Sequence, residues 1–182
     1  GLGEGFSSLS DERGKRRFDS VVAIERDEFS HQTLFVRHFM RGFPEGEAPD
    51  DYYDFLKGEL TADQLFKKHP AAYAHAKKSA LRISLGDDSH AAVKKIIRDR
   101  LAGEERWALV GGPPCQAYSL VGRSRMMNRP EFEQDERHTL YLEYLKIIID
   151  HRPPIFVMEN VKGLLSAAIE GKPAITRIVR DL

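Results

Sequence analysis

The sequence predicts an α/β protein with a Rossmann-like, doubly wound and mainly parallel sheet. Short apolar segments rich in β-branched residues alternate with longer segments of helical periodicity along the 182 residues. Polar or reactive residues stand directly after several of the short segments. The composition agrees, because 41% hydrophobic and 31% charged residues are typical of a globular domain. These observations favour one domain of alternating strands and helices.

The first expected strand covers residues 20–24 and ends at Glu25. Asp27 can cap the next helix, whose apolar positions include Phe29, Thr33, Leu34, Val36 and Phe39. Glycines and prolines then predict a loop, and residues 50–78 have the pattern of short amphipathic helices with lysine-rich faces. We therefore expect residues 41–80 to form a helical insertion or lid rather than core.

The middle of the chain repeats the strand–helix alternation. A strand is expected over residues 81–85, and it closes on a Gly-Asp-Asp turn that contains Asp87. A helix over residues 90–101 follows, with apolar residues at helical spacing. The next strand, 106–110, leads into a long loop that holds the only cysteine, Cys115. Two prolines stiffen this loop just before the cysteine.

The last third of the chain predicts two more helices around one strand. The first helix covers residues 139–150, with Leu142, Leu145, Ile148 and Ile149 on one side. Two prolines stop it, and a strand over residues 155–158 ends at Glu159. We expect a final helix over residues 173–182. Internal repeats and low-complexity segments are absent from the sequence.

Four reactive or ligand-binding side chains lie at or just after the carboxyl ends of the predicted strands, namely Glu25, Asp87, Cys115 and Glu159. In a doubly wound sheet these ends share one edge, so the four residues are expected to line one crevice. Taken singly, each has an ordinary alternative, such as an unreactive loop cysteine, a helix cap, a turn or a solvated carboxylate. Their common position is what indicates a site.

Charge and cysteine content exclude several classes of protein. The 28 basic and 28 acidic residues balance, so global charge favours neither nucleic acid nor membrane. A single cysteine excludes an intrachain disulfide and agrees with a reducing cytoplasm. No apolar stretch approaches the roughly 20 residues that cross a bilayer, and no signal-peptide pattern occurs. The glycine-rich start without a preceding strand leads us to expect a fragment.

Five short motifs follow one another along the chain. They are Gly1-Leu-Gly-Glu-Gly-Phe6, Ala23-Ile-Glu25, Gly112-Pro-Pro-Cys-Gln-Ala-Tyr-Ser119 with Gly122-Arg123, Thr139-Leu140, and Met158-Glu-Asn-Val161. In order and rough spacing, this set resembles the motifs of the DNA cytosine-C5 methyltransferases. The resemblance covers about the first half of that family's catalytic domain. It implies a fold of the S-adenosylmethionine-dependent methyltransferase type, with the first strand and the target-recognition domain absent from residues 1–182.

The resemblance also implies a role for individual residues and for partners. Catalysis would fall to Cys115 and Glu159, cofactor binding to Gly1, Gly3, Phe6, Glu25, Asp87, Pro113 and Leu140, and substrate binding to Gln116, Ser119, Arg123 and Asn160. The implied cofactor is S-adenosylmethionine, and no metal site is expected because the histidines lack ligand spacing beside the cysteine. The implied partners are double-stranded DNA containing the target cytosine and a cognate restriction endonuclease, in a bacterial cytoplasm.

The chemistry of cytosine explains why such an enzyme needs a thiol and an acid. Carbon 5 is a poor nucleophile until a thiolate adds to carbon 6 and makes carbon 5 enamine-like, which splits one hard step into two easier ones. The base must leave the duplex to be reached. Three alternatives stay open at this stage: an RNA (tRNA) cytosine-C5 methyltransferase, a half-domain that binds a partner or cofactor without catalysis, and, more remotely, a thiol hydrolase.

Overall fold

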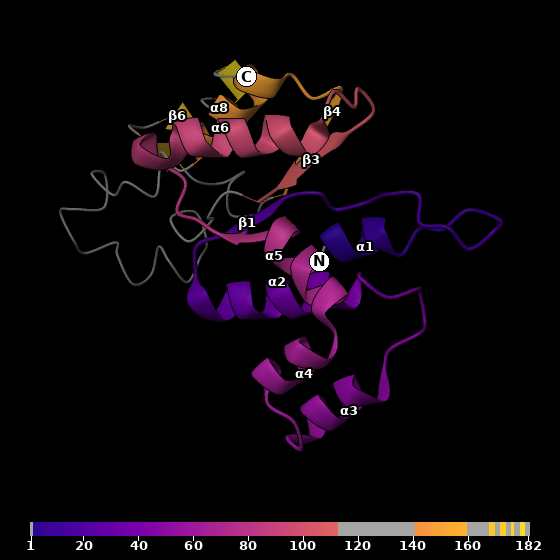
Figure 1. The fold of residues 1–182 in the computed structure, drawn as a ribbon. Coiled ribbons are helices and arrows are strands. Elements are labelled where there is room, and N and C mark those ends of the chain that lie inside the picture. Colours follow the sequence, from indigo (N-terminus) through magenta and orange to yellow (C-terminus); the bar gives the residue numbers. More distant parts are fainter. Residues whose placement is uncertain are drawn as a thin grey trace. The chain divides into compact units, whose positions relative to one another are not determined.

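The structure is a computed structural model that describes residues 2–112 and 141–159, together with residues 168–169, 172–173, 176 and 179–180. The chain divides into two compact units, Gly1–Leu101 and Ala102–Leu182. Each unit is described by itself, with the labels of Figure 1. The described elements alternate between helices and short strands, which confirms a mixed α/β chain but does not by itself give the complete doubly wound sheet.

The first unit contains six helices and two strands among its described residues. In order these are α1 (Leu2–Ser7), β1 (Ala23–Glu25), α2 (Glu28–Met40), α3 (Asp50–Lys57), α4 (Ala62–Lys68), α5 (Pro70–Ser79), β2 (Ala80–Arg82) and α6 (Asp87–Leu101). Strands β1 and β2 pair in parallel, with Ala23 opposite Ala80 and Glu25 opposite Arg82. Both expected strands are confirmed, but each is three residues long and is shifted relative to its predicted range.

Helix α2 begins as the sequence predicts. Asp27 is its N-cap, and Asp27 Oδ1 accepts a hydrogen bond from the backbone N–H of Ser30 at 2.8 Å. The predicted apolar face is correct at Phe39, which is fully buried, but wrong at Phe29, which is 76% exposed, and at Thr33, which is also exposed. Phe29 lies in the first turn of the helix, before α2 reaches the residues that pack against α5.

Residues 41–80 contribute to the hydrophobic core, so the expectation that they lie outside it is wrong. The buried cluster joins Phe39 of α2 to Leu65 of α4 and to Ala72 and Ala76 of α5. Gly42 allows this contact, because a Cβ there would lie 2.8 Å from the Cα of Ala72. The predicted short helices are confirmed as α3, α4 and α5. Whether they are an insertion stays a prediction.

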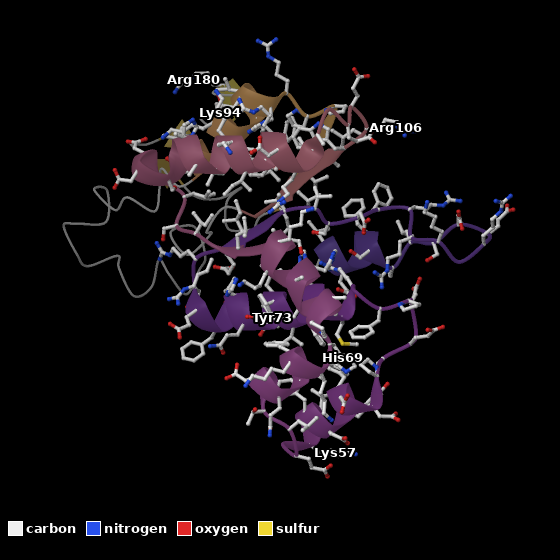
Figure 2. All side chains as sticks on the ribbon, viewed as in Figure 1. Lys57, His69, Tyr73, Lys94, Arg106 and Arg180 are labelled. Atoms are coloured by element: carbon white, nitrogen blue, oxygen red, sulfur yellow. The ribbon has the colours of Figure 1, made fainter. Side chains whose placement is uncertain are left out.

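Aromatic rings fill the space around this cluster. The ring of Phe66 lies 5.2 Å from that of Tyr73, which is labelled on α5 in Figure 2, and 5.1 Å from that of Phe39. His69, also labelled there, packs edge-on against Phe43 at 5.3 Å. Offset and edge-on contacts at these distances stabilise a core beyond the burial of area. Aromatic rings of α2, α4 and α5 therefore pack against one another.

The described part of the second unit is built around two parallel strands, β3 (Ala108–Gly111) and β4 (Ile155–Met158), with Ala108 opposite Ile155 and Gly111 opposite Met158. Helix α8 (Tyr141–His151) precedes β4. The strand predicted over residues 155–158 is confirmed at both ends. Parallel pairing of strands separated by a helix is the expected βαβ arrangement.

Two expectations about the second unit need correction. Ile149 of α8 is 68% exposed, whereas Tyr144, Leu145 and Ile147 are buried, so the apolar side is rotated from the predicted one. The predicted final helix begins too early, because Lys172–Pro173 forms strand β6 and pairs antiparallel with β5 (Ala168–Ile169). Helical backbone occurs at residues 176 and 179–180.

His38 of α2 is the largest buried polar side chain among the described residues, with no exposed surface. Its Nδ1 lies 2.7 Å from Ser79 Oγ, whose single proton goes to the carbonyl of His75. Nδ1 is therefore the protonated nitrogen, and Nε2 accepts a hydrogen bond from Arg41 at 2.9 Å. Burial, together with the nearby charge of Arg41 and His75, lowers the pKa of His38 from 6.5 to about 4.

We predict that this histidine makes the protein lose stability in acid. Between pH 6.5 and 4, His38 becomes protonated in the unfolded chain but stays neutral in the folded protein. The free energy of unfolding is therefore largest above pH 6.5 and falls as the pH drops toward 4. The loss should be on the order of 3 kcal/mol. Urea unfolding at several pH values measures it, with His38→Gln as the non-titrating control. If the free energy of unfolding changed equally with pH in the wild-type protein and in His38→Gln, the assignment of this effect to His38 would be contradicted.

Candidate functional site

Glu25 is the last residue of β1, where the predicted site begins. Its Oε1 accepts hydrogen bonds from the backbone N–H groups of Arg26 at 2.7 Å and Asp27 at 2.8 Å, in the turn that leads into α2. The Glu25 carbonyl accepts from the N–H of Ile83 at 3.2 Å, which ties this point to the chain beyond β2. Within the described residues, no hydrogen bond or ion pair engages Oε2, which leaves it as an acceptor.

Asp87 is separated from its strand by four residues, because β2 ends at Arg82 and α6 begins at Asp87 itself. The turn before α6 is held by Ser89, whose hydroxyl donates to the carbonyl of Ser84 at 2.7 Å. The predicted helix therefore starts three residues earlier than expected. Since β1 and β2 are parallel, Glu25 and the segment that leads to Asp87 leave their sheet at the same edge.

The glycine-rich segment at the start of the chain forms α1, which contains Gly3 and Phe6. A Cβ placed at Gly3 or Gly5 would meet nothing within 4 Å, so open space surrounds the segment at both positions. Phe6 packs edge-on against Phe18, with ring centroids 5.3 Å apart. The predicted cofactor segment is thus present as a short, loosely packed helix.

In the second unit, Glu159 lies against the backbone at the end of β3, just before the segment of sequence that contains Cys115. Its N–H donates to the carbonyl of Gly111 at 2.8 Å, which continues the parallel ladder one residue past β4. A Cβ on Gly112 would lie 2.6 Å from Glu159 Oε2 and 3.2 Å from its carbonyl oxygen. Only glycine at position 112 leaves the carboxylate in this position. The structure therefore brings together Gly112 and Glu159, which are 47 positions apart in the sequence.

Tyr144 of α8 supports the same strand ends from one face of the sheet. A Cβ on Gly111 would lie 2.6 Å from Tyr144 Cε2, so the ring rests directly on the glycine. The single hydroxyl proton is shared between the carbonyls of Val157 at 2.9 Å and Leu109 at 3.2 Å, one on each strand. Burial raises the pKa of Tyr144 to about 12.

Several of the predicted site residues lie outside the described residues. They are Gly1, Pro113, Cys115, Gln116, Ser119, Arg123, Leu140 and Asn160. Their roles stay predictions. The structure places Gly3, Phe6, Glu25 and Asp87 in the first unit and Glu159 in the second. The single crevice expected to unite both groups also stays a prediction.

Comparison with known proteins decides the family. The family described as C-5 cytosine-specific DNA methylase matches residues 67–178, well over half of the chain. The chain belongs to this family. The matched range contains Asp87, Cys115 and Glu159, so both predicted catalytic residues fall within it. The resemblance drawn from the sequence motifs is confirmed at the level of the family.

Curated relatives are restriction-associated and phage methyltransferases. Type II methyltransferase M.Bpa9945I of Bacillus paralicheniformis is 28% identical over 92% of this chain and 39% of its own length. Type II methyltransferase M.FnuDI of Fusobacterium nucleatum is 42% identical over 41% of this chain and 20% of its own. Orphan methyltransferase M.SPRI of Bacillus phage SPR is 38% identical over 47% of this chain and 16% of its own length. The chain thus spans two fifths or less of these relatives. No solved structure matches significantly.

Sequence reasoning missed the supporting residues of this methylase-family site. Tyr144 reads as one more apolar position of a helix, and its contact with Gly111 has no sequence signal beyond the glycine pair itself. Among the described residues, no group of three histidine, cysteine or acidic side chains could hold a metal ion. In the same part of the chain, no helix is long and apolar enough to cross a membrane.

We predict that Gly111 and Tyr144 are energetically coupled. Gly111→Ala should destabilise the protein by about 1–3 kcal/mol, because its Cβ forces the ring to move. In a Tyr144→Ala background the same change should cost much less, because the ring is gone. Denaturant unfolding of the two single variants and the double variant measures the coupling. Equal costs of Gly111→Ala in both backgrounds would contradict the contact.

Proposed function

We propose that the protein containing this chain is a DNA cytosine-C5 methyltransferase that uses S-adenosylmethionine. The observation that supports this best is the contact between the Glu159 carboxylate and Gly112, since only two residues of chain separate Gly112 from Cys115. An acid and a thiol are the two groups that addition to a cytosine ring needs. Membership of the C-5 cytosine-specific methylase family agrees with this chemistry.

Cys115 is the proposed nucleophile. A free cysteine has a pKa near 8.5, so attack on carbon 6 of the flipped-out base needs a deprotonated thiol or concerted proton loss. The new sulfur–carbon bond makes carbon 5 enamine-like, and carbon 5 then forms a bond to the methyl group. Loss of the carbon 5 proton and departure of the thiolate restore the aromatic ring. S-adenosylmethionine would supply the methyl group as an electrophilic sulfonium, whose sulfur–methyl bond breaks to leave a neutral thioether.

Glu159 is proposed to hold the Watson–Crick edge of the base. Protonated, or sharing a proton with ring nitrogen 3, its carboxyl group would neutralise the negative charge that builds in the ring as sulfur adds. Gln116, Ser119, Arg123 and Asn160 are the proposed contacts to the extruded nucleotide and its phosphates. Asn160 directly follows Glu159 in the sequence and belongs to the same Glu-Asn-Val motif.

The first unit fits the proposed cofactor at two points. Glu25 Oε2 is an acceptor at a strand end, which suits a ribose hydroxyl. The open space around Gly3 and Gly5 suits the close approach of a ligand to the backbone. Asp87 is the proposed acceptor for the adenine amino group. Phe6, Gly1, Pro113 and Leu140 complete the proposed set.

The proposed partner is double-stranded DNA that contains the target cytosine. Relatives named type II methyltransferases support a role in restriction–modification, with a cognate endonuclease as a second partner. Another relative is named an orphan methyltransferase rather than a type II methyltransferase. The endonuclease partner is therefore a proposal separate from methyl transfer. The complete sheet of the proposed catalytic domain is the doubly wound one that the alternation of strands and helices predicts.

We predict that Cys115→Ser abolishes methyl transfer, with a loss of about a thousandfold or more. Glu159→Gln should lower the rate by about a hundredfold. The assay follows labelled methyl groups from S-adenosylmethionine into cytosine-containing duplex DNA with the full-length protein. DNA containing 5-fluorocytosine should trap a covalent complex with the wild-type protein and none with Cys115→Ser, because fluorine blocks loss of the carbon 5 substituent.

The exposed Glu105→Gln, in the same unit as Glu159, is the control for a general effect of charge. It should retain wild-type activity. Duplex DNA and tRNA are offered in parallel. Transfer to tRNA alone would favour the RNA enzyme, and a wild-type protein that neither methylates nor traps either substrate would overturn the proposal.

We predict that Glu25→Gln weakens cofactor binding without slowing chemistry. The amide keeps the shape of the side chain but loses the charged acceptor for a ribose hydroxyl, so the KM for S-adenosylmethionine should rise about tenfold. The kcat and the KM for DNA should change little. Steady-state kinetics at varied cofactor concentration measure both, with the exposed Glu12→Gln as the control. An unchanged KM would remove Glu25 from the site.

A further inference from the structure

Helix α1 cannot hold its own shape. It has six residues, whereas isolated helices need about 12–15 to be even marginally stable. Gly3 and Gly5 each weaken it by about 1 kcal/mol relative to alanine. A Cβ at either glycine would meet nothing within 4 Å, so no neighbouring side chain packs over these two positions. Contacts from other elements must therefore hold the segment that the proposed function assigns to the cofactor.

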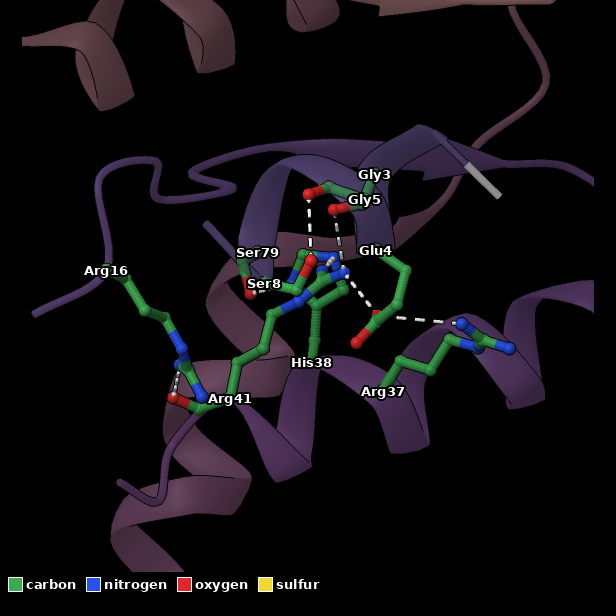
Figure 3. A network of polar contacts seen from close by, with 9 residues as sticks. All are labelled: Gly3, Glu4, Gly5, Ser8, Arg16, Arg37, His38, Arg41 and Ser79. Carbon is green, nitrogen blue, oxygen red and sulfur yellow. Dashed lines mark hydrogen bonds and ion pairs between the residues drawn. The ribbon is translucent and has the colours of Figure 1, made fainter. Parts of the chain in front are cut away.

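Arg41, at the end of α2, supplies such contacts. Its Nη2 lies 3.0 Å from Glu4 Oε2 and 3.4 Å from the carbonyl of Gly3, so one nitrogen reaches both a side chain and the backbone of α1 (Figure 3). The Arg41 side chain is only 10% exposed. Charge-assisted hydrogen bonds from a largely buried guanidinium are stronger than pairs between exposed side chains.

The guanidinium of Arg41 is itself held by a second group of hydrogen bonds. Its Nη1 donates a hydrogen bond to Nε2 of the buried His38, and Nδ1 of His38 donates one to Ser79 Oγ. Ser79 is the last residue of α5, and β2 begins at the next residue. Two nitrogens of one planar fork thus serve two partners at once, which a lysine ammonium does not reproduce. The chain of contacts in Figure 3 links α1 to α2 and to the end of α5.

Arg37 provides an internal comparison. It lies one turn earlier on α2 and also pairs with Glu4 Oε2, but at 3.5 Å and with 49% of its side chain exposed. It has no described contact with His38. The two arginines therefore share one carboxylate partner and one helix. They differ in burial and in the anchor behind the guanidinium.

We propose that Arg41 is a positioning residue for cofactor binding, which holds the glycine-rich helix α1 in place through Glu4 and is itself anchored on His38 and Ser79. This inference rests on the proposed function, because the use of α1 for S-adenosylmethionine is part of it. Arg41 acts through α1 and is assigned no contact with the cofactor. Its loss should therefore weaken binding of the cofactor selectively.

The test compares Arg41→Ala with Arg37→Ala in the full-length protein. Arg41→Ala should raise the KM for S-adenosylmethionine, and the Kd for S-adenosylhomocysteine in calorimetry, by about five- to tenfold. The kcat at saturating cofactor and the KM for DNA should stay within about twofold of wild type. Arg37→Ala should change none of these by more than about twofold. Arg41→Lys should restore less than half of the lost affinity on a logarithmic scale.

A double variant separates positioning from simple loss of stability. If Arg41 acts through Glu4, Glu4→Ala/Arg41→Ala should bind S-adenosylhomocysteine no more weakly than the weaker single variant. Additive losses, or an Arg41→Ala protein whose Kd equals that of Arg37→Ala, would overturn the inference while leaving the proposed function intact. A wild-type protein that binds neither S-adenosylmethionine nor S-adenosylhomocysteine would overturn both.

Discussion

A buried imidazole that must stay neutral is the constraint on which the first unit depends. His38 has no exposed surface, and its two nitrogens have opposite roles, donor to Ser79 and acceptor from Arg41. A protonated ring would lose the acceptor and place two cations side by side in a poorly solvated environment. The ends of α2 and α5 and the largely buried side chain of Arg41, which reaches α1, are thus all arranged around one tautomer.

The second unit depends on contact rather than on charge. Gly111 and Gly112 carry no side chain because the Tyr144 ring occupies one position and the Glu159 carboxylate occupies the other. Tyr144 also joins β3 to β4 through two main-chain carbonyls, so helix and strands are fixed just before the segment of sequence that contains Cys115. Glycine here allows close approach at a sheet end, which is a different use from the turns at positive φ elsewhere.

The sequence predicted what local chemistry determines. Asp27 as a helix cap and the strand at Ile155–Met158 follow from short-range rules, and both are confirmed. The exposed Phe29 and Ile149 were misplaced because helical spacing allows two neighbouring faces, and only tertiary packing chooses between them. Arg41 contacts Glu4 across a separation of 37 positions in the sequence, and Gly112 contacts Glu159 across 47 positions. No local sequence pattern contains such contacts.

Motifs and supports therefore carry different information about this site. A motif such as Met158-Glu-Asn-Val161 names groups whose chemistry is recognisable in isolation, and the family match contains it. The supports are ordinary residues, an arginine, a histidine and a tyrosine, whose importance comes only from where they lie. Because a positioning group must satisfy its own hydrogen bonds while it holds another segment, burial together with complete pairing is the signal that identifies it. His38 and Tyr144 meet that condition, whereas Arg41 meets it at both terminal nitrogens but not at Nε, which is buried without a hydrogen-bond partner among the described residues.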